Sequence, residues 1–306
     1  MTRFDVVGFG ALNVDRLYKV NKISTAGAEG YVTCCEEACG GSAANTIVGL
    51  SRLGCKTGFI GKVADDPEGQ MLLEGFRREG VDTAGIRVQP GSRSGMVMGF
   101  VDEEGERALY IDPGVNDTLT LNEVKTEYAK QTELLHLASF VGQKAFETQK
   151  KLLNTIPESV KISLDPGEIY ARKGLAALEP ILEKCHVLMP NARELQILAG
   201  KPDYQDNANV MLDKGAKTVA VKLGKNGCYV TDGKEKHHVE AFKAKVVDTT
   251  GAGDAFNAGF LYGLLKDKEL GECGMIGNFV ASRCVMKMGA RTCLPTLAEL
   301  KKIKLA

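Results

Sequence analysis

Residues 246–256 read Val-Val-Asp-Thr-Thr-Gly-Ala-Gly-Asp-Ala-Phe, a turn of small residues that leads into an apolar helical run over residues 255–265. Gly251, Ala252 and Gly253 have little or no side chain where backbone N–H groups emerge from the expected helix start. Those N–H groups and the helix dipole favour an anion such as phosphate. Asp254 follows directly, either as a helix cap or as a general base, because a hydroxyl that attacks phosphorus must lose its proton.

Short apolar runs of strand type alternate with helix-like segments along most of the chain. The strand-type runs cover residues 4–8, 55–61, 134–138, 160–164, 186–189 and 218–223, and the helical patterns cover residues 43–53, 67–80, 144–155, 171–183, 192–199 and 206–214. Asp66 and Pro67 suit the start of a helix, and Gly54 suits the end of one. Strands separated by helices predict an α/β fold with a mostly parallel sheet that is covered on both faces.

Two excursions depart from this alternation. Residues 17–20 and 31–34 are short β-like pieces, and residues 95–112 resemble two strands around the acidic turn at 102–105. Tandem repeats, low-complexity tracts and long linkers are not visible in the sequence. We therefore expect a single domain over residues 1–306, with segments of about 16–38 and 92–112 outside its main body.

The composition excludes several classes of protein. The 306 residues are 44% hydrophobic and 25% charged, as in globular chains and unlike disordered or collagen-like ones. Thirty-nine basic residues balance thirty-nine acidic ones, so no overall charge points to nucleic acid or to an anionic membrane. The sequence opens without a signal-peptide pattern and has no run of about eighteen apolar residues. A cytoplasmic location and a small-molecule partner are expected.

Cysteine and histidine show no standard metal-ligand spacing. The nine cysteines are odd in number and irregular in spacing, with no CxxC pair, so we expect reduced thiols, and a redox or metal role for Cys34, Cys35 and Cys39 is the alternative. None of the four histidines stands at a zinc-ligand spacing from a cysteine pair. Two nucleotide-binding motifs are also disfavoured: Gly8-Phe9-Gly10 is followed by Asn13 where the dinucleotide motif needs a third glycine, and no G-x-x-x-x-G-K-[ST] occurs.

The sequence resembles one known family over essentially its whole length. Residues 248–261, DTTGAGDAFNAGFL, resemble the C-terminal motif of the ribokinase-like carbohydrate kinases, also called PfkB. Residues 40–45, GGSAAN, with Gly54 are similar to the N-terminal motif, and residues 8–15, GFGALNVD, to the family's opening. The resemblance implies a three-layer α/β/α body with a small β-sheet lid. It also implies transfer of the γ-phosphoryl group of ATP, with Mg²⁺, to a primary hydroxyl of a sugar or sugar-bearing substrate.

The resemblance assigns roles to individual residues. Asp254 is the implied catalytic base, and the transferred phosphoryl group is implied to lie at the amides of Gly251, Ala252 and Gly253. The residues that match the family's acceptor contacts, suited to hydrogen-bond a polyol, are Asn13, Asp15, Gly41 and Asn45. The residues that match its nucleotide contacts are Lys222, Gly224, Gly227 and Asn278. Many relatives carry Thr in place of Lys222, and helix packing is the alternative role for Asn278.

Two metal sites are implied in the same way. Asn191 and Glu194 match the family's NxxE motif and could hold Mg²⁺ through water, or they could simply cap a helix. Asp248, Thr250 and the turn at 289–291 resemble loops that hold a monovalent cation such as K⁺ in some relatives, although Cys293 stands where ribokinases tend to carry Ser.

The acceptor is less clearly indicated than the reaction. Ser139, Phe140 and Val141 stand where ribokinases tend to present a Glu, and Asp165 is not followed by the D-x-N-x-R pattern of fructokinases. Residues 165–167 and 273–277 are more similar to archaeal nucleoside kinases of the family. Phe140 and Tyr110 could stack on a base or belong to the core.

We therefore predict a sugar kinase, with a nucleoside kinase as the alternative and a non-catalytic sugar-binding or regulatory relative as the third reading. The specificity wall is expected from the lid and residues 139–141. The lid is expected to close over the acceptor and to pair two subunits, because exposed strand edges tend to be covered.

Overall fold

The computed structural model describes residues 3–104 and 106–302. Within these residues one large sheet has the strand order β13-β12-β11-β10-β9-β8-β1-β4-β5. It is parallel from β11 to β5, and β12 and β13 add two antiparallel strands at one edge. Its strands are β1 (Phe4–Phe9), β4 (Thr57–Ala64), β5 (Asp82–Gln89), β8 (Thr132–Ala138), β9 (Lys161–Asp165), β10 (Val187–Leu188), β11 (Thr218–Lys222), β12 (Cys228–Thr231) and β13 (Lys236–Val239).

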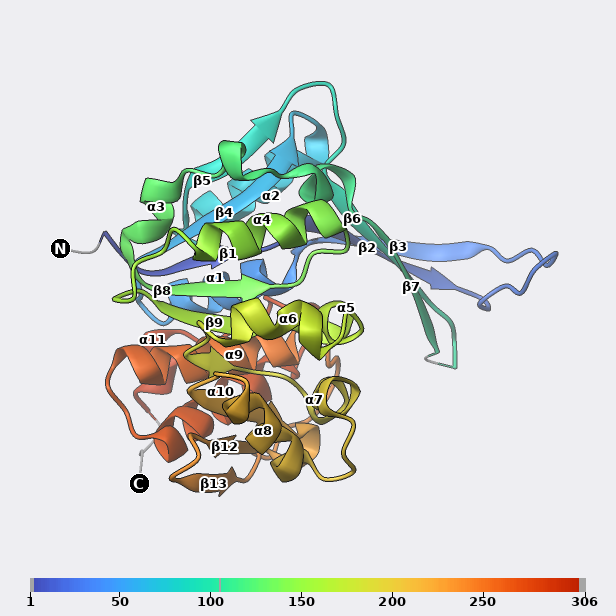
Figure 1. Ribbon diagram of the computed structural model, residues 1–306. Helices are drawn as coiled ribbons and strands as arrows, with labels where there is room; N and C mark the ends of the chain where they lie inside the picture. The colour runs from blue at the N-terminus through green and yellow to red at the C-terminus, as the bar shows by residue number, and fades with distance from the viewer. Residues whose placement is uncertain (1–2, 105, 303–306) are drawn as a thin grey trace.

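Helices cover both faces of this sheet (Figure 1). Successive strand side chains point to opposite faces, so Val6 packs in one core cluster and Val7 in the other. The first cluster lies under α1 (Ser42–Arg52), α2 (Pro67–Arg78), α9 (Ala252–Leu265), α10 (Leu270–Cys284) and α11 (Leu297–Leu300). The second lies under α3 (Thr126–Lys130), α4 (Gln143–Leu153), α5 (Gly167–Ala171), α6 (Leu175–Leu182), α7 (Ala192–Ala199) and α8 (Tyr204–Asp213). The predicted three-layer fold is confirmed.

A second, four-stranded sheet projects from this body (Figure 1). Its order is β3-β2-β6-β7, from β2 (Asn13–Val20), β3 (Val32–Gly40), β6 (Gly95–Val101) and β7 (Arg107–Asp112). The predicted small sheet is therefore present, and we call it the lid sheet. Alternation along β2 puts Asp15 and Leu17 on one face and Tyr18 on the other. The single-domain organisation and the motion of the lid sheet stay predictions.

Local signals placed several helix ends correctly. The Asp66 carboxylate accepts a hydrogen bond of 2.8 Å from the Gly69 amide at the start of α2, and Gly54 has φ +86° just after α1. The helical pattern at 171–183 is in fact split between α5 and α6, because Gly174 takes φ +85°. Among the described residues, no helix has both the length and the hydropathy that crossing a membrane requires.

Candidate active site

Two clefts lie on either side of the start of α9. The first cleft has a volume of about 820 Å³ and lies between the lid sheet and the body; its polar residues include Asn13, Asp15, Asn45 and Asp254, and its apolar ones include Leu17, Val97, Leu109 and Met288. The second cleft, of about 880 Å³, is lined by Asn191, Tyr204 and several basic side chains, namely Arg193, Lys222, Lys225 and Lys243. The first cleft suits a neutral polar molecule with an apolar part, and the second suits an anion.

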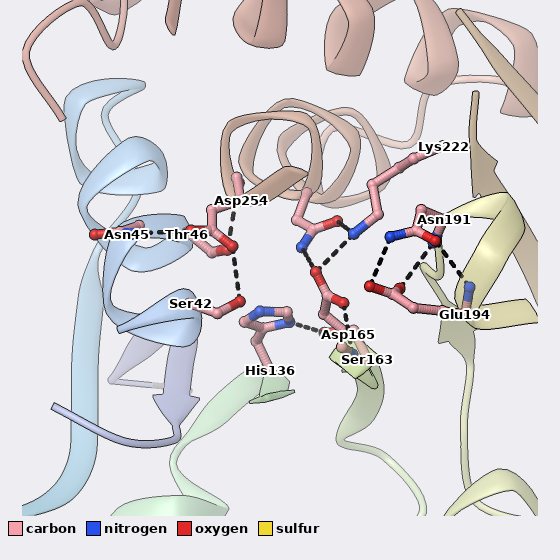
Figure 2. Close-up of polar contacts among 12 residues, drawn as sticks. Ser42, Asn45, Thr46, His136, Ser163, Asp165, Asn191, Glu194, Lys222 and Asp254 are labelled. Carbon is pink, nitrogen blue, oxygen red and sulfur yellow. Dashed lines mark hydrogen bonds and ion pairs between the residues drawn. The ribbon is translucent and has the colours of Figure 1, made fainter. Parts of the chain in front are cut away.

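Asp254 is held by two donors from the start of α1 (Figure 2). The Ser42 hydroxyl donates to Asp254 Oδ1 over 2.7 Å, and Asn45 Nδ2 donates to Asp254 Oδ2 over 2.9 Å. The Thr46 hydroxyl donates to the Asp254 backbone carbonyl over 3.3 Å. These contacts join the two glycine-rich motifs of the sequence, whose helices α1 and α9 pack together. Each carboxylate oxygen keeps a free lone pair that could accept a proton from a molecule in the first cleft.

The environment of Asp254 disfavours its charged form. Burial raises the pKa of Asp254 to about 7, and the nearby Asp165 carboxylate acts in the same direction. The hydrogen bonds from Asn45 and Ser42 and the ammonium of Lys222 oppose this rise. A carboxylate whose pKa lies near neutrality is suited to general-base catalysis.

The turn before α9 needs glycine for steric reasons. Gly251 is the N-cap with φ +76°, and a Cβ there would collide with Ala290. The Ala252 amide donates to the Thr249 carbonyl over 3.2 Å, so this predicted anion donor is already used within the turn. At Gly253 a Cβ would lie 3.4 Å from Lys222 Nζ. An anion at the start of α9 would therefore also meet the lysine.

Lys222 is nearly buried and paired with a carboxylate (Figure 2). Its Nζ lies 2.7 Å from Asp165 Oδ2, and these side chains are 13% and 7% exposed. Asn257, one turn along α9 from Asp254, donates to the same Asp165 oxygen over 2.5 Å. Burial acts to lower the pKa of Lys222, but the Asp165 and Glu194 carboxylates outweigh it and raise that pKa. Lys222 is thus a fixed positive charge between the two clefts.

Asn191 and Glu194 form a reciprocal capping box at the start of α7. Asn191 Oδ1 accepts from the Glu194 amide over 2.8 Å, while the Glu194 carboxylate accepts from the Asn191 amide over 2.9 Å and from Asn191 Nδ2 over 2.7 Å. Burial and then the Asp165 carboxylate raise the pKa of Glu194. Each of its oxygens receives one of these bonds and keeps a lone pair that could bind a water of hydrated Mg²⁺. The capping geometry is therefore compatible with the predicted metal role.

Asp248 is held by the backbone of two loops. Its Oδ1 accepts from the Thr250 amide over 2.9 Å, and its Oδ2 accepts from the Gly289 amide over 2.8 Å. These bonds bring together the loop before α9 and the turn at 289–291, as the predicted monovalent-cation site requires. Within the described residues, no group of three or more His, Cys, Asp or Glu side chains could hold a metal ion.

The remaining predicted acceptor contacts line the first cleft. Burial raises the pKa of Asp15 to about 6, and the guanidinium of Arg291 opposes this rise. Asn13 is nearly buried, and its Oδ1 accepts from Asn116 Nδ2 over 3.0 Å. Gly41 has φ +104°, and a Cβ there would collide with the Ala11 carbonyl. Asn13, Asp15, Gly41 and Asn45 are thus brought to one cavity with Asp254.

Of the predicted nucleotide contacts, Lys222 lines the second cleft, and the other three are not among its lining residues. Gly224 begins the short 3₁₀ turn that follows Lys222 and Gly227 comes directly after it, with φ of +59° and +82°. The side-chain Nδ2 of Asn278 donates to the backbone carbonyls of Val239 and Glu240 over 2.9 and 3.1 Å. Asn278 therefore supports the loop at the edge of this cleft, and both of its N–H donors are used there.

The two aromatic residues considered for base stacking lie outside the first cleft. Phe140 is fully buried and packs edge-on against Phe9, with ring centroids 5.7 Å apart. Tyr110 is 60% exposed and stands on the opposite face of the lid sheet from Leu109. None of the described residues that line the first cleft comes from 139–141. The expected wall at 139–141 is therefore not part of this cavity.

Sequence reasoning missed several polar residues of the site. Ser42 lies inside the quoted GGSAAN motif and Asn257 inside DTTGAGDAFNAGFL, so their positions were visible but their roles were not. Asp165 and Lys222 are 57 residues apart, and no local pattern links them. His136 is fully buried beside Ser163, with Nδ1 and Oγ 2.9 Å apart, and burial lowers its pKa to about 4. It is neutral at physiological pH.

Comparisons with known proteins agree with this geometry. Residues 3–297 match the family model of the pfkB family carbohydrate kinases. An uncharacterised sugar kinase of Archaeoglobus fulgidus is 46% identical over 81% of this chain and 98% of its own length. A ribokinase of Staphylococcus aureus is 29% identical over 97% of this chain and 99% of its own. The crystal structure of a Thermotoga maritima ribokinase superposes with a TM-score of 0.87 at 25% identity, covering 97% of this chain and 98% of that one.

Proposed function

The chain belongs to the pfkB family of carbohydrate kinases, and on that premise we propose that it transfers the γ-phosphoryl group of ATP to a primary hydroxyl of a sugar. One observation carries the proposal. The Asp254 carboxylate lies in the first cleft at the start of α9, and Lys222 reaches the same helix start from the basic second cleft. The start of α9, where a phosphate is favoured, thus has a base for the acceptor on one side and cationic groups for the nucleotide on the other.

In this mechanism the acceptor hydroxyl gives its proton to Asp254 as its oxygen bonds to the γ-phosphorus. The bond between that phosphorus and the bridging oxygen breaks, and ADP leaves with the electron pair. Ser42 and Asn45 keep the carboxylate aimed at the first cleft. The amides of Gly251 and Gly253, with the Lys222 ammonium, stabilise charge on the transferred group. Because Asp254 must be ionised to act, activity should fall as the pH drops below about 7.

Metal ions have proposed places beside this machinery. Glu194 and Asn191 would hold Mg²⁺ through water, and the ion would supply positive charge that neutralises the phosphates of ATP. A monovalent cation such as K⁺ is proposed at the loops that Asp248 joins, next to Thr250. Replacement of K⁺ by a large organic cation tests that site, since activity should then decrease if the ion supports the turn before α9.

A nucleoside is the second candidate acceptor, and one observation favours it. The first cleft has apolar walls, with Leu109 51% exposed and Met288 44% exposed, above a polar floor at Asp15 and Asn45. Such walls could receive a flat base while the floor binds the ribose hydroxyls. The lid sheet is proposed to close over either acceptor and to pair two subunits of a cytoplasmic homodimer, and closure would exclude water.

A substrate panel tests the reaction and the acceptor together. ADP release is measured with ribose, fructose, inositol, adenosine and cytidine, each with ATP and Mg²⁺. Sugar kinase activity requires a free sugar to be the best substrate. A free sugar preferred about a hundredfold over every nucleoside, roughly 2.7 kcal/mol, would eliminate the nucleoside candidate. ADP release from none of these acceptors would leave the non-catalytic reading in its place.

The Asp254→Asn variant tests the base. Loss of the proton acceptor should lower kcat by about 10²- to 10⁴-fold with little change in ATP affinity. Asp203→Asn is the matched control, because Asp203 caps α8 through the amides of Gln205 and Asp206 and Asn caps equally well. Asp254→Asn with wild-type turnover would show that Asp254 is not the base.

A further inference from the structure

Both sides of the Asn45 amide are occupied by hydrogen bonds. Arg291 Nε donates to Asn45 Oδ1 over 2.7 Å, and Asn45 Nδ2 donates to Asp254 Oδ2 over 2.9 Å. The first cleft is lined by Asn45 and Asp254, and Arg291 stands behind Asn45. The three side chains therefore form a chain of donors that ends on the carboxylate.

Arg291 is itself held firmly. Its second guanidinium nitrogen donates to the Gly40 carbonyl over 3.4 Å, and the guanidinium carbon lies 5.8 Å from the centre of the Phe76 ring. Its backbone carbonyl accepts from Arg52 over 2.7 Å, and Arg52 forms an ion pair with Glu79. A guanidinium fixed by several contacts loses little freedom in making the bond to Asn45.

We propose that Arg291 is a positioning residue for phosphoryl transfer, which acts through Asn45 to keep an N–H donor directed at the Asp254 carboxylate. An Asn amide presents a donor or an acceptor depending on which way it is turned. With Oδ1 fixed by the guanidinium, only Nδ2 can face Asp254. Without Arg291 the amide could turn, and its oxygen would then repel the carboxylate. The inference rests on the proposed role of Asp254 as the base.

The charges around Asp254 determine what removal of Arg291 does. The Asp165 carboxylate, from β9, raises the pKa of Asp254, and the Lys222 ammonium, from β11, lowers it. The Asp254 carboxylate in turn raises the pKa of the Cys284 thiol on α10. Arg291, in the turn after α10, also interacts favourably with Asp254. Loss of its positive charge and of a secure donor both favour the protonated form, so the pKa of Asp254 should rise further.

The test compares three variants of the full-length chain over pH 5 to 9. Arg291→Met should move the acid limb of kcat/KM upward by about one pH unit, which is a tenfold loss at low pH and a much smaller one at pH 9. Arg291 also holds down the pKa of Asp15 in the same cleft, so the carboxyl titration described next assigns the shift to Asp254. Arg291→Lys keeps the positive charge and one N–H donor, so its acid limb should lie between that of the natural chain and that of Arg291→Met. Arg52→Met disturbs the same turn without touching Asn45, so it should lower stability and leave the acid limb in place.

A second measurement reads the carboxyl group without turnover. Carbon-13 NMR of labelled aspartate, with the Asp254 signal assigned by its absence in Asp254→Asn, should give a higher titration midpoint in Arg291→Met or, if that variant does not fold, a smaller rise in Arg291→Lys. Combining Arg291→Met with Asn45→Ala should give a shift smaller than the sum of the two single shifts, because the donor that they share is lost only once and only the direct effect of the Arg291 charge is added.

The outcomes separate this inference from the proposed function. An unchanged midpoint in the Arg291 variants, equal loss of activity at every pH, or additive effects with Asn45→Ala would overturn the role of Arg291 as a positioning residue. Wild-type turnover in Asp254→Asn would instead overturn the role of the base itself. Loss of activity in Asp254→Asn with a wild-type pH profile in Arg291→Met would refute only the present inference.

Discussion

Lys222 and Asp165 form an ion pair in a nearly buried position, and removing either partner alone leaves an uncompensated charge. We expect Asp165→Asn to lower the free energy of unfolding by about 3 kcal/mol. Asp165→Asn combined with Lys222→Met should recover most of that stability, because no buried charge is left unpaired and the Asn oxygen can still accept from Asn257. Turnover should not recover, since the cation beside Gly253 is lost. Urea unfolding and kcat measure the two effects separately, and wild-type turnover in the double variant would make Lys222 merely structural.

At the same scale, the sequence could predict Asp254 but not the pairing of Asp165 with Lys222. Asp254 stands beside Gly251 and Gly253 in one turn, so local chemistry was enough to suggest a base at a phosphate site. Asp165 ends one strand and Lys222 another, and only the order of parallel strands brings their carboxyl ends together. That order is a property of the whole sheet and not of either segment.

Helix α7 begins with a capping box whose carboxylate is also the proposed ligand for hydrated Mg²⁺. Glu194→Gln keeps the two reciprocal bonds of the box but removes the charge and the bond from Asn191 Nδ2, so stability should fall by about 1 kcal/mol. The Mg²⁺ concentration for half-maximal activity should rise at least about tenfold, roughly 1.4 kcal/mol. Glu299→Gln is the matched control, because Thr296 and Glu299 form the same box at α11. An equal Mg²⁺ requirement in both variants would leave Glu194 as a cap only.

Elements with strong end signals were predictable, and weakly patterned ones were not. The start of α2 has an Asp and a Pro whose backbone preferences agree with a helix, and this start is where the structure has it. Strand β13 reads Lys-His-His-Val and is largely exposed, so it lacks the apolar run by which a buried strand is found. The edge strand β5 has an irregular alternation and was missed for the same reason.

At the scale of the whole molecule, the lid sheet has apolar side chains on both of its faces. Leu17, Val97 and Leu109 line the first cleft. On the opposite face Phe100 lies 5.2 Å from Tyr18 and 6.0 Å from Tyr110 between ring centroids. Resemblance to a family was needed to predict that the excursions at 16–38 and 92–112 join in one sheet, because their own patterns were short. The aromatic face has no part in the first cleft and suits a second copy of the chain.

Two exposed tyrosines are the residues to alter for a test of pairing: Tyr31, directly before β3, is 65% exposed, and Tyr110, on β7, is 60% exposed. Light scattering should give a dimer for the natural chain and a monomer for the Tyr31→Glu and Tyr110→Glu double variant, because two charges would be buried without partners. Ile197→Glu on α7, where Ile197 is 37% exposed, controls for an added surface charge and should stay dimeric.

If pairing also holds the lid sheet over the first cleft, the monomer should show a raised KM for the acceptor and an unchanged KM for ATP, since Asp15 is on β2 and Lys222 is on the body. A monomeric natural chain would rule out the dimer, and equal changes in both KM values would show that the lid sheet does not act on the acceptor alone.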